Sequence, residues 1–311
     1  MRDPLSHRPV LYNEIIHVLQ PNRAGRYVDG TLGAGGHAWG ILKASEPEGR
    51  LLGLDLDPEA LRLARDRLVP FGKRAHIVQA SYTTLRAQLD ALGWEMVDGI
   101  LLDLGLSSMQ MDTSERGFSF QQDGSLDMRF DPRNPVRAAD LVNNLTEAEL
   151  ADLLFKYGEE RRSRQVARAI VLARPIHTTR QLAKVVASAT GSGKQGMHPA
   201  TRTFQALRIA VNQELDALAK VLPEAIISLV PGGRLAVIAF HSLEDRIVKQ
   251  YFRQESTDCL CPPWQPMCTC GHSATIREIT RRPMRPTQDE IRQNSRARSA
   301  RLRVAEKLSS G

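Results

Sequence analysis

The chain has 311 residues, of which 42% are hydrophobic and 25% are charged, and these proportions are typical of a folded globular protein. No apolar run approaches the roughly 18 residues of a membrane-spanning helix, and the first ten residues lack the apolar core of a secretory signal, so we expect a cytoplasmic protein without a membrane partner. The formal net charge of +7 suits a polyanionic partner but does not by itself establish one.

Short apolar strands alternate with amphipathic helices over the first hundred residues. Helices are expected to begin near Ala38 and at Pro58, whose missing N–H costs nothing in the first turn of a helix. The expected strands are residues 26–29, 50–55, 76–78 and 97–103. Because strands connected through helices run parallel, the pattern predicts a doubly wound α/β sheet.

The pattern changes after the fourth strand. Residues 116–131 are expected to form a loop or a hairpin, and residues 137–211 are predicted to be helical apart from a Gly-rich break at 191–196. A long helix is expected from Thr201. Two capping boxes are predicted to open helices in this region: Thr146 with Glu149, and Thr178 with Gln181.

The sheet pattern then resumes, with a turn at Gly232-Gly233 and a buried strand at residues 234–240. We therefore predict an α/β fold, in which residues 1–110 and 212–311 form one Rossmann-like domain. Residues 111–211 are predicted to form an all-helical domain that is inserted into it.

Positive charge is concentrated in two segments. Residues 273–311 hold ten Lys or Arg against four acidic residues, and residues 159–180 hold six Arg against two Glu. Near a nucleic acid such side chains release counterions and give a strong, salt-sensitive attraction, although each segment is equally consistent with a solvated helix face. Our hypothesis is that the inserted helical domain recognises RNA.

A glycine-rich turn follows the first strand, with the sequence DGTLGAGGH at residues 29–37. Gly33 and Gly35 let the backbone approach a ligand, and the helix that follows offers free N–H groups. Asp55 ends the second strand, 22 residues after Gly33, where its carboxylate can accept hydrogen bonds from both hydroxyls of a ribose. The combination predicts a site for a nucleoside cofactor.

The turn alone does not identify that cofactor. Gly33-x-Gly35-x-x-Ala38 also fits a relaxed dinucleotide fingerprint, so NAD stays open at this point. Asp29 favours S-adenosyl-L-methionine, because a carboxylate before the turn suits the ammonium of a methionyl group and would repel a pyrophosphate. The alternative role for Asp29 is to cap the turn.

Polar residues also follow two later strands. Asp103 ends the fourth strand, and the segment Phe240–Arg246 follows the strand at residues 234–240. In an open α/β sheet, ligands bind beyond the carboxyl ends of the strands. We therefore expect these groups at the same edge as the glycine turn, although polar residues at strand ends also serve as plain caps.

Seven segments resemble those of the bacterial ribosomal RNA small subunit methyltransferase H family, the MraW-type cytosine N4-methyltransferases. The resemblance runs nearly from end to end of the chain. Its segments are DGTLGAGGH at 29–37, DLGLSS at 103–108, RGFSF at 116–120, LDMR at 126–129, KYGEER at 156–161, FHSLED at 240–245 and RARS at 296–299.

The resemblance implies an S-adenosyl-L-methionine-dependent methyltransferase that modifies the exocyclic N4 amine of a cytosine in the decoding centre of 16S ribosomal RNA. It also implies that the cofactor is contacted by Gly36, His37, Ala38, Asp55, Tyr82, Asp103 and Gln110. Tyr82 fits independently, since it follows the third strand and could stack on adenine. Alternatively, His37 is a residue at the start of the helix that does not contact a ligand.

Methylation of an exocyclic amine needs a group that orients the N–H and helps to remove its proton. We hypothesise that Asp103 is the nearest carboxylate for this role, with cofactor binding alone as its alternative. The candidate orienting groups are Ser107, Ser108 and His241. The target base must leave its stack to react. Phe118 and Phe120 could stack on that base, and buried packing is the alternative for both.

Four cysteines lie close together as Cys259-x-Cys261 and Cys268-x-Cys270, with His272 nearby. Four thiolates could bind a structural zinc ion, but two residues between the members of each pair is the commoner spacing, and the family does not need a metal. Bound zinc, reduced thiols and redox pairing therefore stay open. We expect no catalytic metal.

Two other functions compete with methyl transfer. An NAD-dependent oxidoreductase would explain Asp55 but leaves Asp29 and the positive charge without a role. An RNA-binding protein with a zinc module and no activity would leave the polar strand ends without a role. The sequence does not decide between a monomer and a homodimer, or between free RNA and the assembled small subunit as the partner.

Overall fold

The structure is a computed structural model that describes residues 9–191 and 198–309, so nearly all of the break expected at 191–196 lies outside the described residues. The chain divides into two compact units. The first, here called the α/β unit, comprises Met1–Gly105 and Leu215–Gly311. The second, the helical unit, comprises Leu106–Glu214.

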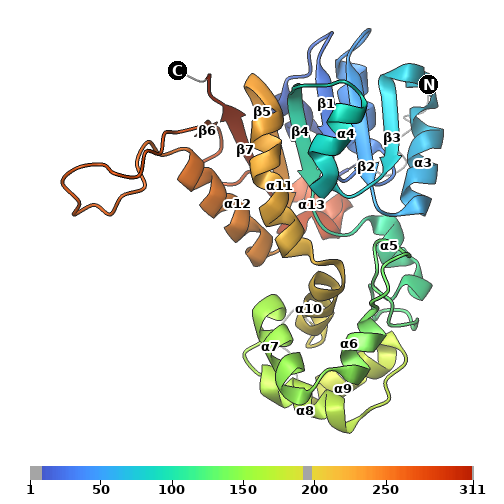
Figure 1. Ribbon diagram of the computed structural model, residues 1–311. Helices are drawn as coiled ribbons and strands as arrows, with labels where there is room; N and C mark the ends of the chain where they lie inside the picture. Colours follow the sequence, from blue (N-terminus) through green and yellow to red (C-terminus); the bar gives the residue numbers. More distant parts are fainter. Residues whose placement is uncertain (1–8, 192–197, 310–311) are drawn as a thin grey trace. The chain divides into compact units, whose positions relative to one another are not determined.

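The α/β unit is built on a seven-stranded sheet in the order β3-β2-β1-β4-β5-β7-β6 (Figure 1). The strands β1 to β5 pair in parallel, whereas β7 is antiparallel to β5 and β6. This arrangement confirms the predicted Rossmann-like α/β class. The strands are β1 Arg26–Asp29, β2 Arg50–Asp55, β3 Ala75–Gln79, β4 Val97–Asp103, β5 Leu229–Ala239, β6 Ile276–Glu278 and β7 Arg301–Lys307.

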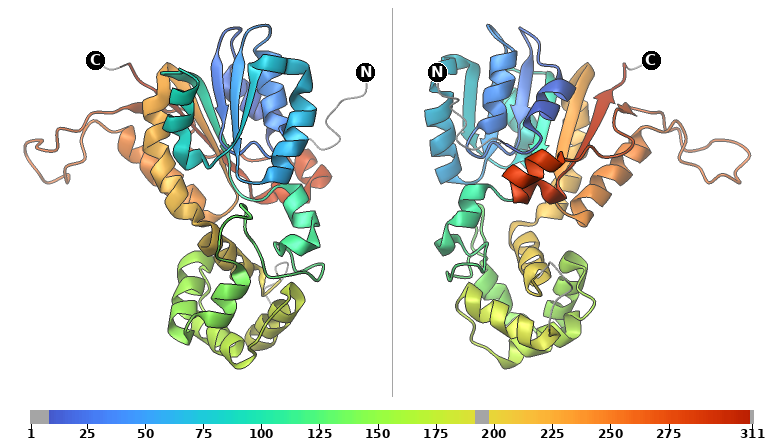
Figure 2. Two further views of the ribbon diagram at one scale, coloured as in Figure 1. Left: turned by 45° about the vertical axis from the view of Figure 1, so that its right-hand side comes forward. Right: turned by 180° about the vertical axis from the view of Figure 1, so that it is seen from behind.

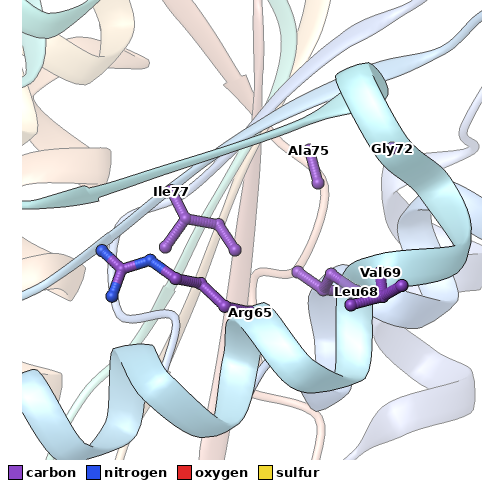
Figure 3. A pocket seen from close by; sticks show the side chains of 6 residues that line it. All are labelled: Arg65, Leu68, Val69, Gly72, Ala75 and Ile77. Atoms are coloured by element: carbon purple, nitrogen blue, oxygen red, sulfur yellow. The ribbon is translucent and has the colours of Figure 1, made fainter.

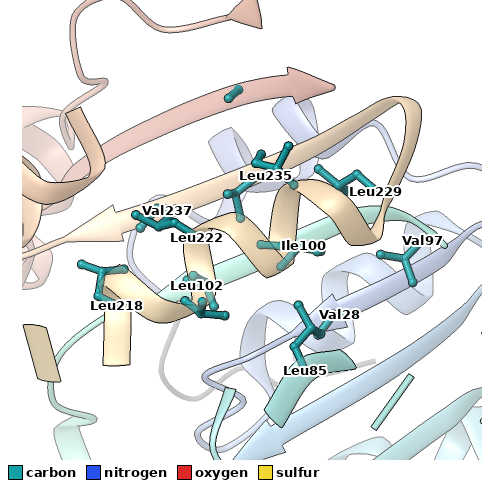
Figure 4. Close-up of a cluster of buried hydrophobic side chains, with 14 of the residues drawn as sticks. Val28, Leu85, Val97, Ile100, Leu102, Leu218, Leu222, Leu229, Leu235 and Val237 are labelled. Atoms are coloured by element: carbon teal, nitrogen blue, oxygen red, sulfur yellow. The ribbon is translucent and has the colours of Figure 1, made fainter. Parts of the chain in front are cut away.

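Helices cover both faces of this sheet (Figure 2). On one face, Leu102 of β4 and Val237 of β5 are buried together with Leu222 of α11 (Figure 4). On the other face, Leu51 and Leu101 are buried against Ile41 of α2. The first face carries α4 Leu85–Ala91, α11 Glu214–Ser228 and α12 Ser242–Glu255, and the second carries α1 Tyr12–Leu19, α2 Gly36–Ala44 and α3 Pro58–Leu68.

Apolar residues on both sides of each central strand explain why these strands appear in the sequence as continuous apolar runs.

Shorter helices complete the chain. They are η1 Val69–Arg74, η2 Tyr82–Thr84, α5 Ser108–Asp112, η3 Ser114–Arg116, α13 Gln288–Gln293 and η4 Ser295–Ser299. Among the residues that the structure describes, no helix is both long and apolar enough to cross a membrane.

Two parts of the sheet differ from the prediction. The turn expected at Gly232-Gly233 is wrong, because these residues belong to β5 and form an irregularity in its pairing with β4. Val97 pairs with Leu229 and Gly99 with Arg234, and the extra residues are accommodated by a positive φ of 81° at Gly232. The antiparallel strands β6 and β7 were not predicted, since their arginines had been interpreted only as positive charge.

The helical unit packs its helices around a separate core that includes Leu150, Leu154, Ile170 and Leu207. Both predicted capping boxes are present, at the starts of α7 and α9. The helix expected from Thr201 is present and ends at Asn212, where the left-handed backbone of Gln213 separates α10 from α11. Besides the short α5 and η3, the described helices of the unit are α6 Ala138–Asn144, α7 Glu147–Gly158, α8 Ser163–Leu172, α9 Thr179–Thr190 and α10 Thr201–Asn212.

The segment that was expected to be a loop or hairpin forms a loop with one isolated bridge, between Ser125 and Thr178. Its aromatic side chains belong to the core of the helical unit. Phe118 stacks on Phe130 at a ring-centroid distance of 5.5 Å, and Phe120 packs edge-on against Phe204 at 4.9 Å. Of the two roles considered for Phe118 and Phe120, the structure therefore favours buried packing over stacking on a base.

Loss of the α9 cap should destabilise the helical unit. The Thr178 hydroxyl accepts a hydrogen bond from the Gln181 N–H at 3.3 Å. Removing it in Thr178→Ala should lower the free energy of unfolding by about 1 kcal/mol, because an N-terminal N–H of the helix loses its partner. Urea denaturation followed by circular dichroism measures this loss. Thr178→Ser is the matched control, and equal losses in both variants would contradict the capping role.

Candidate cofactor and catalytic site

Three carboxylates stand at the carboxyl ends of neighbouring strands in the α/β unit. Asp55 ends β2, Asp29 ends β1 and Asp103 ends β4, and these three strands are adjacent in the sheet. The strand order reverses its direction between β1 and β4, which is the switch point where open α/β sheets bind ligands. The three carboxylates, which the sequence analysis predicted from separate segments, therefore lie at the same edge of the sheet.

The turn between β1 and α2 brings its backbone very close to this edge. The Gly30 N–H donates to the Leu101 carbonyl at 2.9 Å. A Cβ atom on Gly30 would lie 2.7 Å from Leu102 Cδ2 and 3.1 Å from Tyr82 Cβ, so a side chain does not fit there. Gly33 and Gly35 have φ values of 52° and 77°, which favour glycine. Sterics thus account for the glycines even before a ligand is considered.

Asp55 is held by the backbone of the glycine turn and of the next helix start. Its Oδ2 accepts from the Gly33 N–H at 2.7 Å, and its Oδ1 accepts from the Asp57 N–H at 2.9 Å. Burial raises the pKa of Asp55 in spite of these hydrogen bonds. Each oxygen keeps a further lone pair, so the carboxylate is fixed in orientation and can still accept hydrogen bonds from two hydroxyls.

Asp29 is the most deeply buried of the three carboxylates, with 1% of its surface exposed. Burial raises its pKa to about 7, and the negative charges of Asp103 and Asp55 add to the rise. His37 and the Thr31 N–H, which donates to Asp29 Oδ1 at 3.2 Å, oppose it. The three carboxylates at this edge of the sheet therefore carry more negative charge than the surrounding protein groups neutralise.

His37 lies next to Asp103 inside this cluster. Its Nε2 is 3.5 Å from Asp103 Oδ2, and the two side chains are 5% and 24% exposed. Both ring nitrogens of His37 and Oδ1 of Asp103 are buried without a hydrogen-bond partner among the described residues. Tyr12 of α1, which the sequence reasoning missed, stacks on the His37 ring at a centroid distance of 6.2 Å. Asp103 thus combines contact with His37 and partial exposure.

The other residues predicted around the cofactor occupy different places. Gly36 and Ala38 begin α2, and the Ala38 side chain is wholly buried in the core, so only its backbone could contact a ligand. Tyr82 opens η2 after β3 and packs beside Gly30. Gln110 belongs to the helical unit, where it is 6% exposed and forms a capping box with Ser107.

The predicted serines open α5 in the helical unit. Ser107 Oγ accepts from the Gln110 N–H at 3.2 Å, and the Ser107 N–H donates to Gln110 Oε1 at 3.1 Å. These two bonds give Ser107 and Gln110 a clear structural role. Ser108 is the first residue of the helix. All three follow Asp103 closely in the chain, but they belong to the other unit.

His241 follows β5 and caps α12. Its Nε2 lies 3.1 Å from Glu244 Oε1, and its Nδ1 accepts weakly from the Glu244 N–H at 3.4 Å. Glu244 Oε2 in turn accepts from the Phe240 N–H at 2.9 Å. Glu244, which is 2% exposed, was not singled out in the sequence, and the capping-box spacing from His241 was the available signal.

The next residue, Asp245, organises part of the basic C-terminal segment. Arg303 donates to Asp245 Oδ1 at 2.7 Å and Arg301 donates to Oδ2 at 3.0 Å. Burial alone would raise the pKa of Asp245, but the hydrogen bonds and charges of Arg303 and Arg301 outweigh it and hold the pKa below its usual value. These two arginines therefore anchor β7 to α12, whereas Arg281, Arg282, Arg285 and Arg298 are exposed.

Two further features lie apart from the three carboxylates. The cysteines Cys259, Cys261, Cys268 and Cys270 come together in the loop after α12, and none of the acidic site residues belongs to that group. A hollow of about 280 Å³ borders the edge strand β3 and is lined mainly by apolar side chains, among them Leu68 and Ile77 (Figure 3). None of the predicted site residues lines it.

The unneutralised carboxylates and the glycine turn fit the groups of S-adenosylmethionine. Asp55 offers two oriented acceptors for a ribose, and the buried negative charge of Asp29 and Asp103 suits the cationic methionyl end. A pyrophosphate at the same place would face that negative charge at close range. The donor set therefore fits a cationic nucleoside better than a dinucleotide.

Comparison with known proteins shows what the chain is similar to. Residues 4–308 match the MraW methylase family. The chain is 51% identical to a ribosomal RNA small subunit methyltransferase H from Thermomicrobium roseum, with 99% of this chain and 96% of the relative covered. Proteins of the same name from Geotalea uraniireducens and Carboxydothermus hydrogenoformans are 50% and 49% identical, covering 97% and 98% of this chain and 98% of each relative.

Among solved structures, an rRNA methylase from Streptococcus thermophilus aligns with 96% of this chain and 94% of its own chain. Its sequence identity is 11% and its TM-score is 0.42. At that level the likeness carries no weight for function.

The raised pKa of Asp29 predicts a pH-dependent cost to folding in the absence of ligand. The folded carboxyl keeps its proton up to about pH 7, whereas the unfolded one ionises near 3.8, so the folded state is progressively penalised as the pH rises between these values. Asp29→Asn should therefore be more stable than the wild type at pH 8, by at most on the order of 4 kcal/mol. The advantage should shrink toward pH 4.

Thermal unfolding of the ligand-free protein across this pH range measures the difference. Asp152→Asn, on the exposed face of α7, is the control for a general charge effect. A stability difference for Asp29→Asn that stayed constant with pH would show that the buried carboxyl does not titrate as proposed.

Proposed function

This chain belongs to the MraW methylase family, and we propose from that premise that it methylates the exocyclic N4 amine of a cytosine in 16S ribosomal RNA, in the decoding centre of the small subunit. Family membership and relatives of about 50% identity over nearly the whole chain support the coarser statement, that it is an S-adenosylmethionine-dependent ribosomal RNA methyltransferase. The observation that carries the chemistry is the partly exposed Asp103 beside the buried carboxylates.

We assign the cofactor to the edge formed by β2, β1 and β4. Asp55 would accept hydrogen bonds from the ribose hydroxyls, and the backbone of Gly33 and Gly35 would leave room for the ligand. Asp29 would balance the positive charge of the methionyl end, and Tyr82 would contact the adenine. When bound, S-adenosylmethionine supplies an electrophilic methyl group on its sulfonium.

The protein's own task is then to present the acceptor amine in line with that methyl group. Positioning of this kind can supply roughly 7–11 kcal/mol of a barrier. The cytosine amine is a weak nucleophile because its lone pair is conjugated with the ring. Asp103 would accept a hydrogen bond from the amine, direct its lone pair toward the methyl group and receive the amine proton, while the bond from the methyl carbon to sulfur breaks and leaves S-adenosylhomocysteine.

His37 supports Asp103 in this scheme. Its Nε2 is 3.5 Å from the Asp103 carboxylate, and its ring is stacked on Tyr12. This contact limits the directions in which the carboxylate can turn. His241 and Ser107 remain proposed orienting groups for the substrate, although the described bonds of both are helix caps.

Exposed arginines are the proposed contacts for the RNA backbone. In the helical unit, Arg164 and Arg168 lie one turn apart on α8 and Arg161 precedes that helix, and all three are exposed. In the α/β unit, the exposed arginines between β6 and β7 serve the same purpose. Such contacts hold and orient an RNA without reading its sequence.

Loss of the ribose acceptor should weaken the cofactor site without unfolding it. Asp55→Ala should raise the Kd of S-adenosylhomocysteine about 100-fold or more, because two charge-assisted hydrogen bonds are lost and each is worth about 1.5–3 kcal/mol. Isothermal titration calorimetry measures the affinity, and the melting temperature checks the fold. Asp66→Asn, exposed on α3, is the control. Unchanged affinity in Asp55→Ala would remove Asp55 from the site.

The role of Asp103 separates binding from transfer. Asp103→Asn should slow single-turnover methylation about 100-fold or more, because the amide cannot take up the proton, and this loss should exceed any loss of affinity for S-adenosylhomocysteine that removal of the charge causes. Rapid-quench measurement at saturating cofactor and RNA isolates the transfer step. Lost cofactor binding with normal transfer at saturation would make Asp103 a cofactor ligand only.

The nucleotide target is tested with methyl-labelled S-adenosylmethionine and small ribosomal subunits from bacteria that lack this enzyme. We expect label in N4-methylcytosine after complete digestion of the RNA, mapped to the decoding centre. Label on another nucleoside would keep the methyltransferase activity and overturn the proposed target. Absence of label on subunits but presence on free 16S RNA would identify the unassembled RNA as substrate.

A further inference from the structure

The loop between α12 and β6, residues 257–275, is not explained by methyl transfer. Figures 1 and 2 show it extending away from the sheet of the α/β unit as a long excursion without helix or strand. Its large apolar side chains are not buried: Leu260 is 45% exposed, Met267 77% and Trp264 82%. Hydrophobic packing therefore contributes little to holding this loop in one conformation.

The four cysteines of the chain all lie in this loop and meet at one point. Cys259 Sγ is 3.4 Å from Cys268 Sγ and 3.9 Å from Cys270 Sγ, and the sulfurs of Cys268 and Cys270 are 3.5 Å apart. All four sulfurs, including that of Cys261, lie within 4.8 Å of one another. In a tetrahedral site with Zn–S bonds of about 2.3 Å, neighbouring sulfurs would be about 3.8 Å apart.

Backbone N–H groups point at three of these sulfurs. Cys261 N–H donates to Cys259 Sγ, Leu260 N–H to Cys270 Sγ and Thr269 N–H to Cys261 Sγ, each at 3.4 Å. Hydrogen bonds of this type stabilise a thiolate and orient it toward a metal. The two Cys-x-Cys segments thus supply both the sulfur ligands and the donors that surround them.

The loop is closed at its base by ordinary hydrogen bonds. Ala274 N–H donates to Asp258 Oδ1 at 3.2 Å, and Thr275 N–H donates to the Glu255 carbonyl at 2.8 Å. His272, the nearby histidine, has its Nε2 3.2 Å from the Gln254 carbonyl and is not part of the sulfur cluster. The ligand set is therefore four sulfurs.

We propose that Cys259, Cys261, Cys268 and Cys270 bind one structural Zn²⁺ ion, which holds the loop in its folded form. On binding, each thiol gives its proton to solvent and its sulfur forms one bond to the metal. Four protein ligands leave no open position for a substrate or water, so the ion has no part in methyl transfer. The ion fixes the exposed side chains of Trp264 and Met267 on a rigid support.

A structural zinc fits the loop better than disulfides do. Disulfide bonds would join the sulfurs in two pairs, and they would not require all four sulfurs to approach one another. Sets of four sulfurs in a tetrahedron are typical of zinc and of iron–sulfur sites, and metal analysis separates these two. The proposal stands on the loop alone and does not depend on the proposed RNA target.

The test is the metal content of the full-length protein, purified under reducing conditions without chelators and after incubation with ZnCl₂ and desalting. We expect one zinc per chain by plasma mass spectrometry, and Co²⁺ exchange should give the visible spectrum of a tetrahedral thiolate site. Cys259→Ser and Cys270→Ser should each lose the metal. His272→Ala and Trp264→Ala, in the same loop, should keep it.

Circular dichroism and S-adenosylhomocysteine binding establish that the cysteine variants still contain the folded α/β unit. With folding established in this way, zinc retained at full stoichiometry in Cys259→Ser or Cys270→Ser would overturn the four-sulfur site. A wild-type protein that binds no zinc, that holds iron instead, or that contains disulfides under these conditions would equally overturn it. Because the readout is metal content, a wrong RNA target would leave this result unchanged.

Discussion

The constraint on which the site depends is the meeting of three carboxylates at the carboxyl ends of β2, β1 and β4. Parallel strands all point the same way, so acidic residues that end neighbouring strands are forced together. Asp29 is almost fully buried there, and burial, with smaller contributions from the negative charges of Asp103 and Asp55, raises its pKa to about 7. Backbone N–H groups and His37 offset part of that rise, and a cationic ligand is the natural source of the rest.

The sheet could be predicted because each central strand is buried on both faces, which produces a continuous apolar run bounded by polar turns. β1, β2 and β4 were placed at their observed bounds for this reason. β7 could not be predicted in this way, because one of its buried residues is an arginine. Arg303 sits inside a strand at 4% exposure because Asp245, 58 residues earlier, accepts its hydrogen bond. A partner so distant in sequence is invisible to any local pattern, and so the strand looked like a basic tail.

The same distinction divides the candidate site. Asp29, Asp55 and Asp103 could be grouped from sequence, since a residue at the end of a parallel strand has a known place in the sheet. Tyr12 could not, because its importance comes from a contact with His37 that only the folded chain creates. Glu244 lies between these cases, since its capping-box spacing from His241 was a signal in the sequence. For Phe118 and Phe120 the sequence left stacking on a base and buried packing both open. The folded chain favours packing in a separate core, to which Phe130 and Phe204 contribute.

The distribution of charge also bears on how an RNA can be a substrate at all. The reacting edge is acidic and buried, where charges interact strongly, whereas the basic residues are exposed and screened by salt. A phosphate at Asp103 would be repelled at close range, but a neutral base would not. On the proposed placement of the reaction at Asp103, the RNA backbone would stay with the exposed arginines while a single base leaves its stack and enters alone. On this argument, opposite charges inside and outside the site select a flipped nucleobase over any other part of the polymer.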